Sequence, residues 1–190
     1  MELDLENYTY EIRHARTLNE FINDLARGNA GTTLPDDLQK HFIELVQDEF
    51  FFRWPLIRYM YAHILLTGYW VADDYRMQIF ATEGEDIELA KEILLPLAEA
   101  GLAPAQYDIA KWFCFGNSEI EEKAKWILKA SKQDYPPAIK SLETFLALGT
   151  REKLSTETLK EVCLEVVRTY EGQYSGAFAL ELLGKLTREK

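Results

Sequence analysis

The amino-acid sequence predicts an all-α protein, an α-solenoid of helix pairs preceded by an N-terminal helical pair. In three places a proline near the start of an apolar segment is followed 12 or 13 residues later by a glycine, an arrangement typical of short helices. These segments span Pro55–Gly68, Pro104–Gly116 and Pro137–Gly149. The last two glycines lie 33 residues apart, and a period of roughly 30 to 40 residues built from helix pairs indicates an α-solenoid. Strand-like alternation is weak and short, at Tyr8–Ile12.

The N-terminal part of the chain carries the signals of two further helices. Thr17–Glu20 matches a capping box, in which the threonine and glutamate side chains bind backbone N–H groups at a helix start. Apolar residues then recur at helical spacing as far as Gly28, and Pro35 suits the first position of a second helix that continues towards Trp54. We therefore expect a helical extension at residues 1–54 and a repeat region at residues 55–190, within a single compact domain.

Each proline-initiated helix has a partner segment that fits a second helix. Pro96 lies inside the first of these partners and should kink it, the alternative being a shorter helix. The expected partner helices are Ile87–Ala100, capped by Asp86, a helix from the Ser118–Glu121 capping box to Lys132, and a helix from Ser155 or Thr156 to about Tyr170, followed by a last helix at Ala177–Leu186.

The segment LAKEILLPLAEAGLAPAQYDIAKWFCFGN, followed by EEKAKWILKASKQDYPPAIKSL, carries the small and aromatic residues of a known repeat. Ala98–Gly101 followed by Ala105–Tyr107 forms one copy, and Ala124–Trp126 belongs to the next. These residues resemble Sel1-like repeats, which are relatives of the tetratricopeptide repeats. The resemblance is strongest at residues 86–142, weaker at 55–85 and 143–190, and does not include 1–54. It implies TPR-like helix pairs that form a scaffold for protein–protein interaction.

Composition and motifs argue against several classes of function. The chain has 32 acidic and 21 basic residues, a net charge of −11, whereas a nucleic-acid binder needs an excess of Lys and Arg. A Gly-rich phosphate loop, a dinucleotide fingerprint and a Gly-x-Ser-x-Gly elbow are missing from the sequence, and its three histidines lack metal-ligand spacing. We therefore expect no enzymatic activity and no catalytic, cofactor-binding or metal-binding residues.

The sequence also predicts a cytoplasmic location. The acidic N-terminus lacks the apolar core of a signal peptide, and no apolar run approaches the roughly 20 residues of a membrane span. We therefore expect no membrane partner. Cys114 and Cys163 are expected to be buried thiols rather than a disulfide.

The loop from Tyr69 to Glu88 is a candidate binding surface. It has six acidic residues and one basic residue, interleaved with aromatic side chains. Acidic side chains accelerate the encounter with a basic partner, and aromatic side chains supply affinity. The alternative is a solvated, partly helical insertion. The predicted partner-binding residues are Trp70, Asp73, Asp74, Tyr75, Glu83, Glu85 and Asp86, together with Trp112 from the helix that Pro104 opens.

Other aromatic residues are interpreted as packing groups. The run Phe50–Trp54 is expected to form a core at the junction with the repeats, the alternative being an exposed anchor for a partner. His63 lies in an apolar helix and is expected to be a core residue whose polar atoms are satisfied. The aromatic residues expected to pack in or between repeats are Trp112, Phe113, Phe115 and Trp126.

The leading functional hypothesis is a non-catalytic protein–protein interaction module of the bacterial cytosol, whose partner is a protein with a basic surface. A narrower version is an immunity protein that binds and neutralises a basic toxin domain. One alternative is a regulatory adaptor or scaffold of a larger complex. Another is an enzyme or small-ligand binder with a site in the solenoid groove. An enclosed pocket with paired carboxylates and a tyrosine or histidine would favour the enzyme, and a shallow open groove would count against it.

Overall fold

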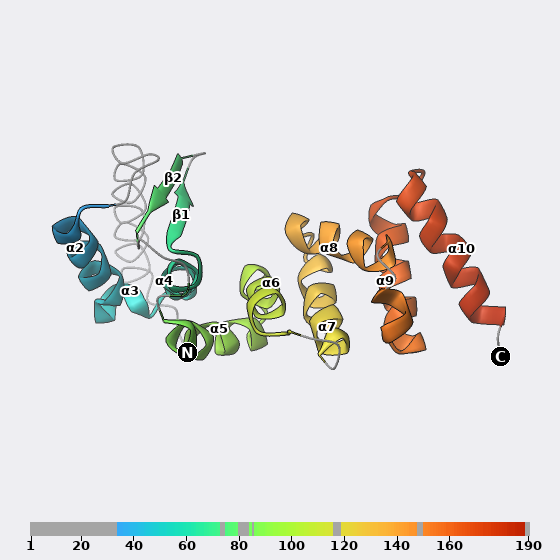
Figure 1. Ribbon diagram of the computed structural model, residues 1–190, viewed down its shortest axis with the longest axis horizontal. Coiled ribbons are helices and arrows are strands. Elements are labelled where there is room, and N and C mark those ends of the chain that lie inside the picture. The colour runs from blue at the N-terminus through green and yellow to red at the C-terminus, as the bar shows by residue number, and fades with distance from the viewer. Residues whose placement is uncertain are drawn as a thin grey trace, which may run out of the picture. The chain divides into compact units, whose positions relative to one another are not determined.

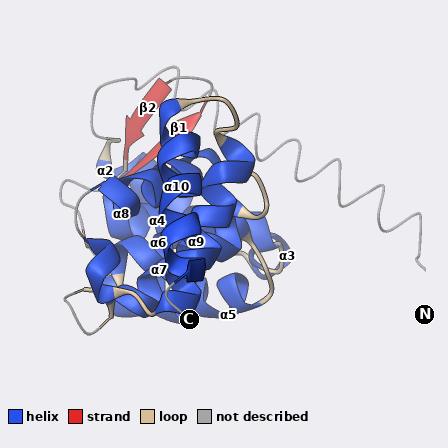
Figure 2. Ribbon diagram, turned by 90° about the vertical axis from the view of Figure 1, so that its right-hand side faces the viewer, coloured by secondary structure: helices blue, strands red, loops and turns tan. Residues whose placement is uncertain are grey.

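A computed structural model describes residues 34–72, 75–79, 84, 86–115, 119–147 and 150–188. These residues are mostly helical (Figures 1 and 2), in agreement with the all-α part of the predicted fold class. The expected helix at 17–28 and the strand-like stretch at 8–12 lie outside the described residues. The elements are α2 (Asp36–Gln47), α3 (Glu49–Phe52), α4 (Pro55–Thr67), β1 (Tyr69–Ala72), β2 (Tyr75–Gln78), α5 (Ile87–Glu99), α6 (Ala103–Trp112), α7 (Ile120–Ser131), α8 (Pro136–Ala147), the 3-10 helix η1 (Thr150–Lys153), α9 (Thr156–Thr169) and α10 (Tyr174–Arg188).

The chain forms two compact units, residues 1–93 and 94–190, and the division falls within α5. The boundary expected after Trp54 does not coincide with this division. Residues 1–93 contain 18 acidic and 8 basic residues, a net charge of −10, whereas residues 94–190 contain 14 and 13, a net charge of −1. Nearly all of the net negative charge therefore belongs to the N-terminal unit.

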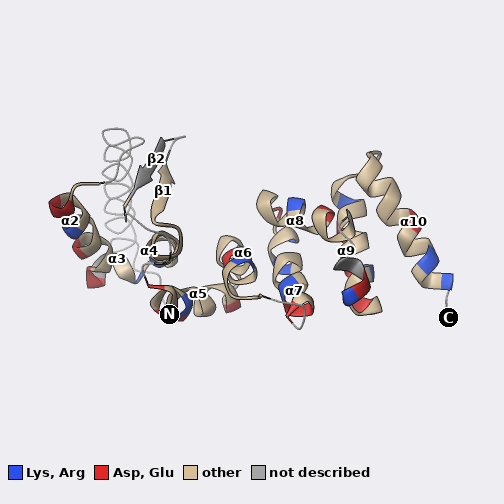
Figure 3. Ribbon diagram, in the orientation of Figure 1, with Lys and Arg blue, Asp and Glu red and all other residues tan. Residues whose placement is uncertain are grey.

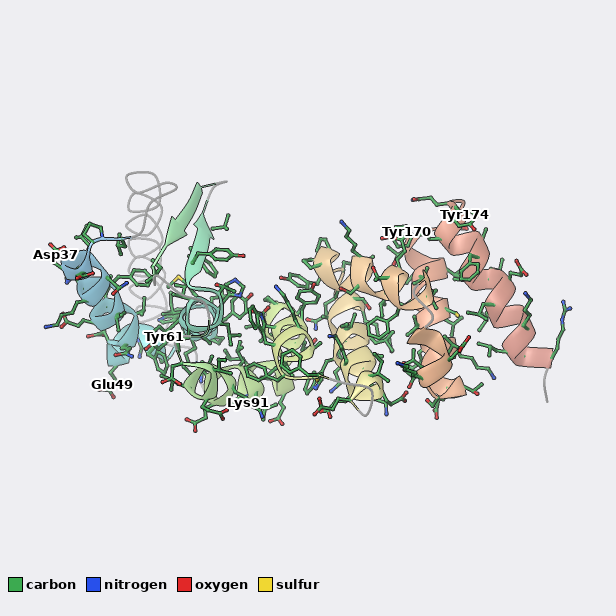
Figure 4. The ribbon with its side chains drawn as sticks, in the orientation of Figure 1. Asp37, Glu49, Tyr61, Lys91, Tyr170 and Tyr174 are labelled. Carbon is green, nitrogen blue, oxygen red and sulfur yellow. The ribbon has the colours of Figure 1, made fainter. Side chains whose placement is uncertain are left out.

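In the N-terminal unit, α4 packs against α2 and α3 and leads directly into β1. Pro35 is the residue before α2 rather than its first helical residue, and the helix stops at Asp48, whose ψ of 133° is extended. The helix expected to run from Pro35 to Trp54 is therefore broken into α2 and α3. Gln47 at the end of α2 donates a 2.6 Å hydrogen bond to the hydroxyl of Tyr61 (labelled in Figure 4), which joins α2 to α4. Gly68 ends α4 as expected, in the left-handed conformation that favours glycine.

The β-hairpin of β1 and β2 is the main departure from an all-helical chain. The two strands are antiparallel, with Tyr69 opposite Gln78 and Ala72 opposite Tyr75. Neither a loop nor a partly helical insertion describes this part of the expected binding segment. The sequence offers a reason, because Tyr69, Trp70 and Val71 are aromatic and β-branched residues that favour strands.

In the C-terminal unit, each helix packs against the next one along the chain (Figure 1). α6 packs on α7, α7 on α8, α8 on α9 and α9 on α10, and α7 also packs on α9. Alanines permit this close packing, and those with almost no exposed surface are Ala105, Ala110, Ala124, Ala130, Ala138 and Ala179. Hydrogen bonds join residues 34 positions apart: Ser141 to Tyr107, Ser155 to Glu121, and Arg168 to Asp134.

The predicted helix caps are confirmed at two sites. The Asp86 carboxylate accepts a 2.9 Å hydrogen bond from the Leu89 N–H at the start of α5. The Ser155 hydroxyl accepts one of 3.2 Å from the Thr158 N–H, so Ser155 rather than Thr156 caps α9. α5 continues through Pro96 to Glu99, and the alternative of a shorter helix is therefore wrong.

Two other helix boundaries differ from expectation. α6 ends at Trp112 rather than near Gly116, and α10 begins at Tyr174, three residues before Ala177. Because the chain leaves the helix after Trp112, Cys114 turns inward and is buried, whereas the Phe115 side chain is 62% exposed. The expectation that Phe115 packs between repeats is therefore wrong.

The remaining packing expectations have mixed outcomes. Trp126 is buried as expected. Cys114 and Cys163 are buried free thiols, as predicted. The Phe52 ring packs edge-on against Tyr61 with centroids 6.2 Å apart, in agreement with a core at the junction. The side chains of Phe50 and Phe51 lie outside the described part of the structure.

The two glycines inside α10 give a matched test of this packing. A Cβ atom at Gly176 would lie 2.1 Å from the Tyr170 carbonyl oxygen, whereas one at Gly184 would meet nothing within 4 Å. Gly176→Ala should lower the free energy of unfolding by about 1–3 kcal/mol, because backbone must move to admit the methyl group. Gly184→Ala should raise it by about 0.5–1 kcal/mol through helix propensity. Urea denaturation of both variants measures the difference, and equal effects would contradict the packing of α10 on the turn after α9.

Candidate functional site

An aromatic cluster joins α4 to the hairpin in the N-terminal unit. Tyr59 and His63 lie one turn apart on α4, and Tyr69 and Trp70 begin β1. The His63 ring has centroid distances of 5.6 Å to Tyr59, 6.3 Å to Tyr69 and 5.8 Å to Trp70. Tyr59 and Trp70 also contact each other, at 6.3 Å. Except for the Tyr59–His63 pair, these contacts are edge-to-face, which is a favourable geometry for aromatic rings.

The cluster is partly open to solvent. Tyr59 is buried, while His63, Tyr69 and Trp70 are half-buried. The His63 Nδ1 lies 3.4 Å from the Tyr59 hydroxyl, so the expected core histidine does have a polar partner but sits nearer the surface than predicted. We refer to Tyr59, His63, Tyr69 and Trp70 as the aromatic cluster.

The hairpin is fixed in place by hydrogen bonds from the helices beneath it. The Thr67 hydroxyl oxygen lies 2.8 Å from the His63 carbonyl oxygen, 3.0 Å from that of Tyr69, and 3.4 Å from the Tyr69 nitrogen. At the other end, the Ile79 N–H donates to the Gly68 carbonyl over 2.7 Å, and the Ile79 side chain is fully buried. The Gln39 amide of α2 donates to the Ile79 carbonyl. The aromatic cluster is therefore held on a fixed support.

The predicted partner-binding residues are distributed over both units. Trp70 belongs to the aromatic cluster, Tyr75 lies opposite Ala72 in the hairpin, and Asp86 caps α5. Trp112 belongs to the C-terminal unit. The members outside the described residues are Asp73, Asp74, Glu83 and Glu85.

Trp112 lies half-buried at the end of α6. The Nζ atom of Lys111 is 5.1 Å from the centroid of its ring. The indole Nε1 is buried and makes no hydrogen bond to the described residues. Trp112 is therefore partly covered by its neighbours, including Lys111, and is not a fully exposed aromatic side chain.

A second candidate surface is an open groove of about 620 Å³ between α7 and α9. The α7 side contributes lysines and Glu121, and the start of α9 contributes acidic and hydroxyl groups. Figure 3 marks the positions of basic and acidic residues along these helices in blue and red. The lining residues are Glu121, Lys125, Leu128 and Lys129 from α7, Lys132 directly after it, and Ser155, Glu157, Thr158 and Glu161 from the start of α9.

The carboxylate of Glu121 lines this groove and joins α7 to the start of α9. It accepts hydrogen bonds from the Ser155 N–H at 3.0 Å, from the Ser155 hydroxyl at 2.9 Å and from the Thr158 hydroxyl. Lys125 adds an ion pair at 3.4 Å. These hydrogen bonds, that of Thr158 first, lower the pKa of Glu121 from 4.5 to about 2. The sequence analysis assigned Glu121 to a capping box with Ser118, but its side chain instead binds the N-terminus of α9.

Ion pairs also link the end of α7 to α9. Lys132 pairs with Glu161 at 2.9 Å across the groove. Arg168 pairs with Asp134 at 3.0 Å and with the buried carboxylate of Glu165 at 2.7 Å. The hydrogen bonds that Arg168 donates to these two carboxylates, that to Glu165 first, raise the pKa of Arg168. A buried carboxylate such as Glu165 requires a paired cation, and Arg168 supplies it.

The groove brings lysine ammonium groups together with carboxylates and hydroxyl groups. Its lining has neither tyrosine nor histidine, and Glu121 is held ionised by its hydrogen-bond donors. In the described part of the chain, no three His, Cys, Asp or Glu side chains are arranged to hold a metal ion. Among the described helices, none is long and apolar enough to cross a membrane.

No protein-family model matches this chain, and no curated protein or solved structure is significantly similar to it. The candidate surfaces therefore rest on the residues and their geometry.

The sequence analysis did not find the groove, although part of its signal is visible in the sequence. Lys125, Lys129 and Lys132 follow each other at spacings of four and three residues, which places them on one face of a helix. Glu157 and Glu161 are likewise four residues apart. That the two faces meet depends on the packing of α7 against α9, which no local spacing encodes.

The Glu121 site predicts a specific dependence of stability on pH. Because the folded pKa of about 2 lies below the ordinary 4.5, ionised Glu121 stabilises the fold above about pH 4.5, and this contribution is lost as the pH falls towards 2. Glu121→Gln should lower the free energy of unfolding by about 1–2 kcal/mol at pH 7, since an amide cannot accept all three hydrogen bonds. Urea denaturation at pH 7 and at pH 3 measures both effects.

Glu121→Gln should lower the free energy of unfolding by less at pH 3 than at pH 7, because at pH 3 the native carboxylate has lost part of its stabilising contribution. Glu157→Gln is the matched control, because Glu157 lines the same groove from the first turn of α9. An equal loss in both variants, or a pH-independent deficit for Glu121→Gln, would show that the carboxylate does not join α7 to α9.

Proposed function

We propose that this chain is a non-catalytic protein–protein interaction module that binds a basic partner protein through its N-terminal unit. The observation that carries the proposal is the division of charge, with a net −10 on residues 1–93 and −1 on residues 94–190. A field of one sign attracts a partner of the opposite sign and raises the rate of association. A neutral unit would not favour a positively charged partner over a negatively charged one.

The aromatic cluster supports the same conclusion. Aromatic side chains are enriched among the residues that contribute most of the binding energy at protein interfaces. Acidic residues around them disfavour partners whose surface is also negatively charged. In this chain the half-buried rings of Tyr69 and Trp70 belong to the unit that carries the negative charge. Exposed carboxylates of that unit include Asp37 on α2 and Glu49 on α3 (labelled in Figure 4).

We infer that the C-terminal unit is a short α-solenoid of TPR-like, Sel1-like helix pairs. The pairs are α6 with α7 and α8 with α9, followed by α10 as the first helix of another pair. Hydrogen bonds between residues 34 positions apart support this inference, because 34 residues is the length of a tetratricopeptide repeat. Such a stack supplies a scaffold rather than a reaction centre.

The narrower form of the proposal is an immunity protein that binds and neutralises a basic toxin domain in the bacterial cytoplasm. The acidity of the N-terminal unit and the aromatic cluster suit that role. The proposal of a binding protein rather than an enzyme draws on the open form of the groove and the chemistry of its lining.

The proposal predicts that binding depends on acidic residues of one unit. The chain is used to capture proteins from a bacterial lysate, and each captured protein is identified and purified. We expect a partner with net positive charge. Glu49→Gln combined with Glu92→Gln, both exposed in the N-terminal unit, should slow its association about two- to fivefold at low ionic strength. Biolayer interferometry at low and high salt measures the rate.

The matched control combines Glu152→Gln with Glu171→Gln, which removes two exposed carboxylates from the C-terminal unit. This variant should bind like the wild type. A purified partner with net negative charge, or equal effects of the two double variants, would overturn the proposal. The immunity version further requires that expression of the partner arrests growth and that co-expression of this chain restores it.

A further inference from the structure

The tryptophans of this chain differ in whether a lysine ammonium group lies over the indole ring. Lys129 places its ammonium group 3.9 Å from the Trp126 ring centroid, and Lys111 lies 5.1 Å from that of Trp112. Both lie within the range of a cation–π interaction. The half-buried Trp70 has aromatic neighbours, and no Lys or Arg whose side chain the structure describes lies over its ring.

The ring of Trp70 thus offers a π-system to a cation from outside the chain. It is held by edge-to-face contacts with Tyr59 and His63, at interplanar angles of 71° and 82°. Because the support beneath it is fixed by Thr67 and Gln39, little conformational entropy is lost on binding. The surrounding unit has a net charge of −10, which concentrates cations near its surface.

We propose that the basic partner is anchored by an arginine whose guanidinium group docks on Trp70 in the aromatic cluster. This proposal rests on the function proposed above and names the partner group that the site recognises. An arginine fits better than a lysine, because its planar guanidinium stacks on aromatic rings and is more weakly hydrated than an ammonium group. Tyr69, half-buried in β1, contacts the same His63 ring as Trp70 does.

The test uses two synthetic peptides of equal length and equal net charge in a Gly/Ser background. One carries arginines and the other carries lysines at the same positions. Isothermal titration calorimetry at low ionic strength measures the affinity of the full chain for each peptide. We expect the arginine peptide to bind about three- to tenfold more tightly than the lysine peptide.

Variants of the cluster show whether Trp70 causes the preference. Trp70→Leu should remove the difference between the two peptides, and Trp70→Phe should retain part of it, since phenylalanine keeps an aromatic face. Tyr174→Leu is the matched control, because Tyr174 is 86% exposed and lies in the other unit. Circular dichroism melting curves verify that each variant is folded, and Trp70→Phe provides the result if Trp70→Leu does not fold.

The outcomes separate this inference from the proposed function. In one outcome the wild type binds both peptides equally, and the double substitution of Glu49→Gln with Glu92→Gln weakens this binding. That result would overturn the arginine anchor and leave the charge-based function in place. A preference for arginine that survives in Trp70→Leu would also overturn the anchor. If neither peptide binds at low ionic strength, both the anchor and the proposed function are overturned.

Discussion

The C-terminal unit depends on contacts between helices that are too short to be stable alone. Its complete helices have 10 to 15 residues, and isolated helices of that length are marginal in water. Each helix therefore has to bury its apolar stripe on its neighbours, which the small residues along α6 to α10 allow. Polar links then fix the register, with Glu121 binding the start of α9 and Asp134 and Glu165 holding Arg168.

The two units differ in what their charges do. In the C-terminal unit, carboxylates such as Glu121 and Glu161 are paired with hydroxyls and lysines, and the unit is almost neutral. In the N-terminal unit, acidic residues outnumber basic ones by 18 to 8, and this excess creates a field directed at the solvent. A unit with unbalanced charge attracts molecules of the opposite charge, whereas paired charges do not. The proposed binding function follows from that difference.

Much of the local structure was predictable because its causes are local. Asp86 and Ser155 cap their helices with side-chain oxygens, and Gly68 provides a left-handed residue at the end of α4. The hairpin was missed because its acidic and aromatic composition suggested a solvated loop. Phe115 was misplaced because the helix was extended to Gly116. Trp70 is among the partner-binding residues that the sequence predicts, whereas its contacts with aromatic rings on α4 are not predicted.

The sequence by itself determined a mostly helical chain, the caps of α5 and α9, the buried thiols and an excess of acidic residues. The tertiary structure decided that this excess belongs to one unit, that Glu121 serves α9 rather than its own helix, and that His63 meets Trp70. The physical reason is the range of the interactions. Caps and helical stripes involve residues a few positions apart, whereas the Glu121–Ser155 bond joins residues 34 positions apart and exists only when helices have packed.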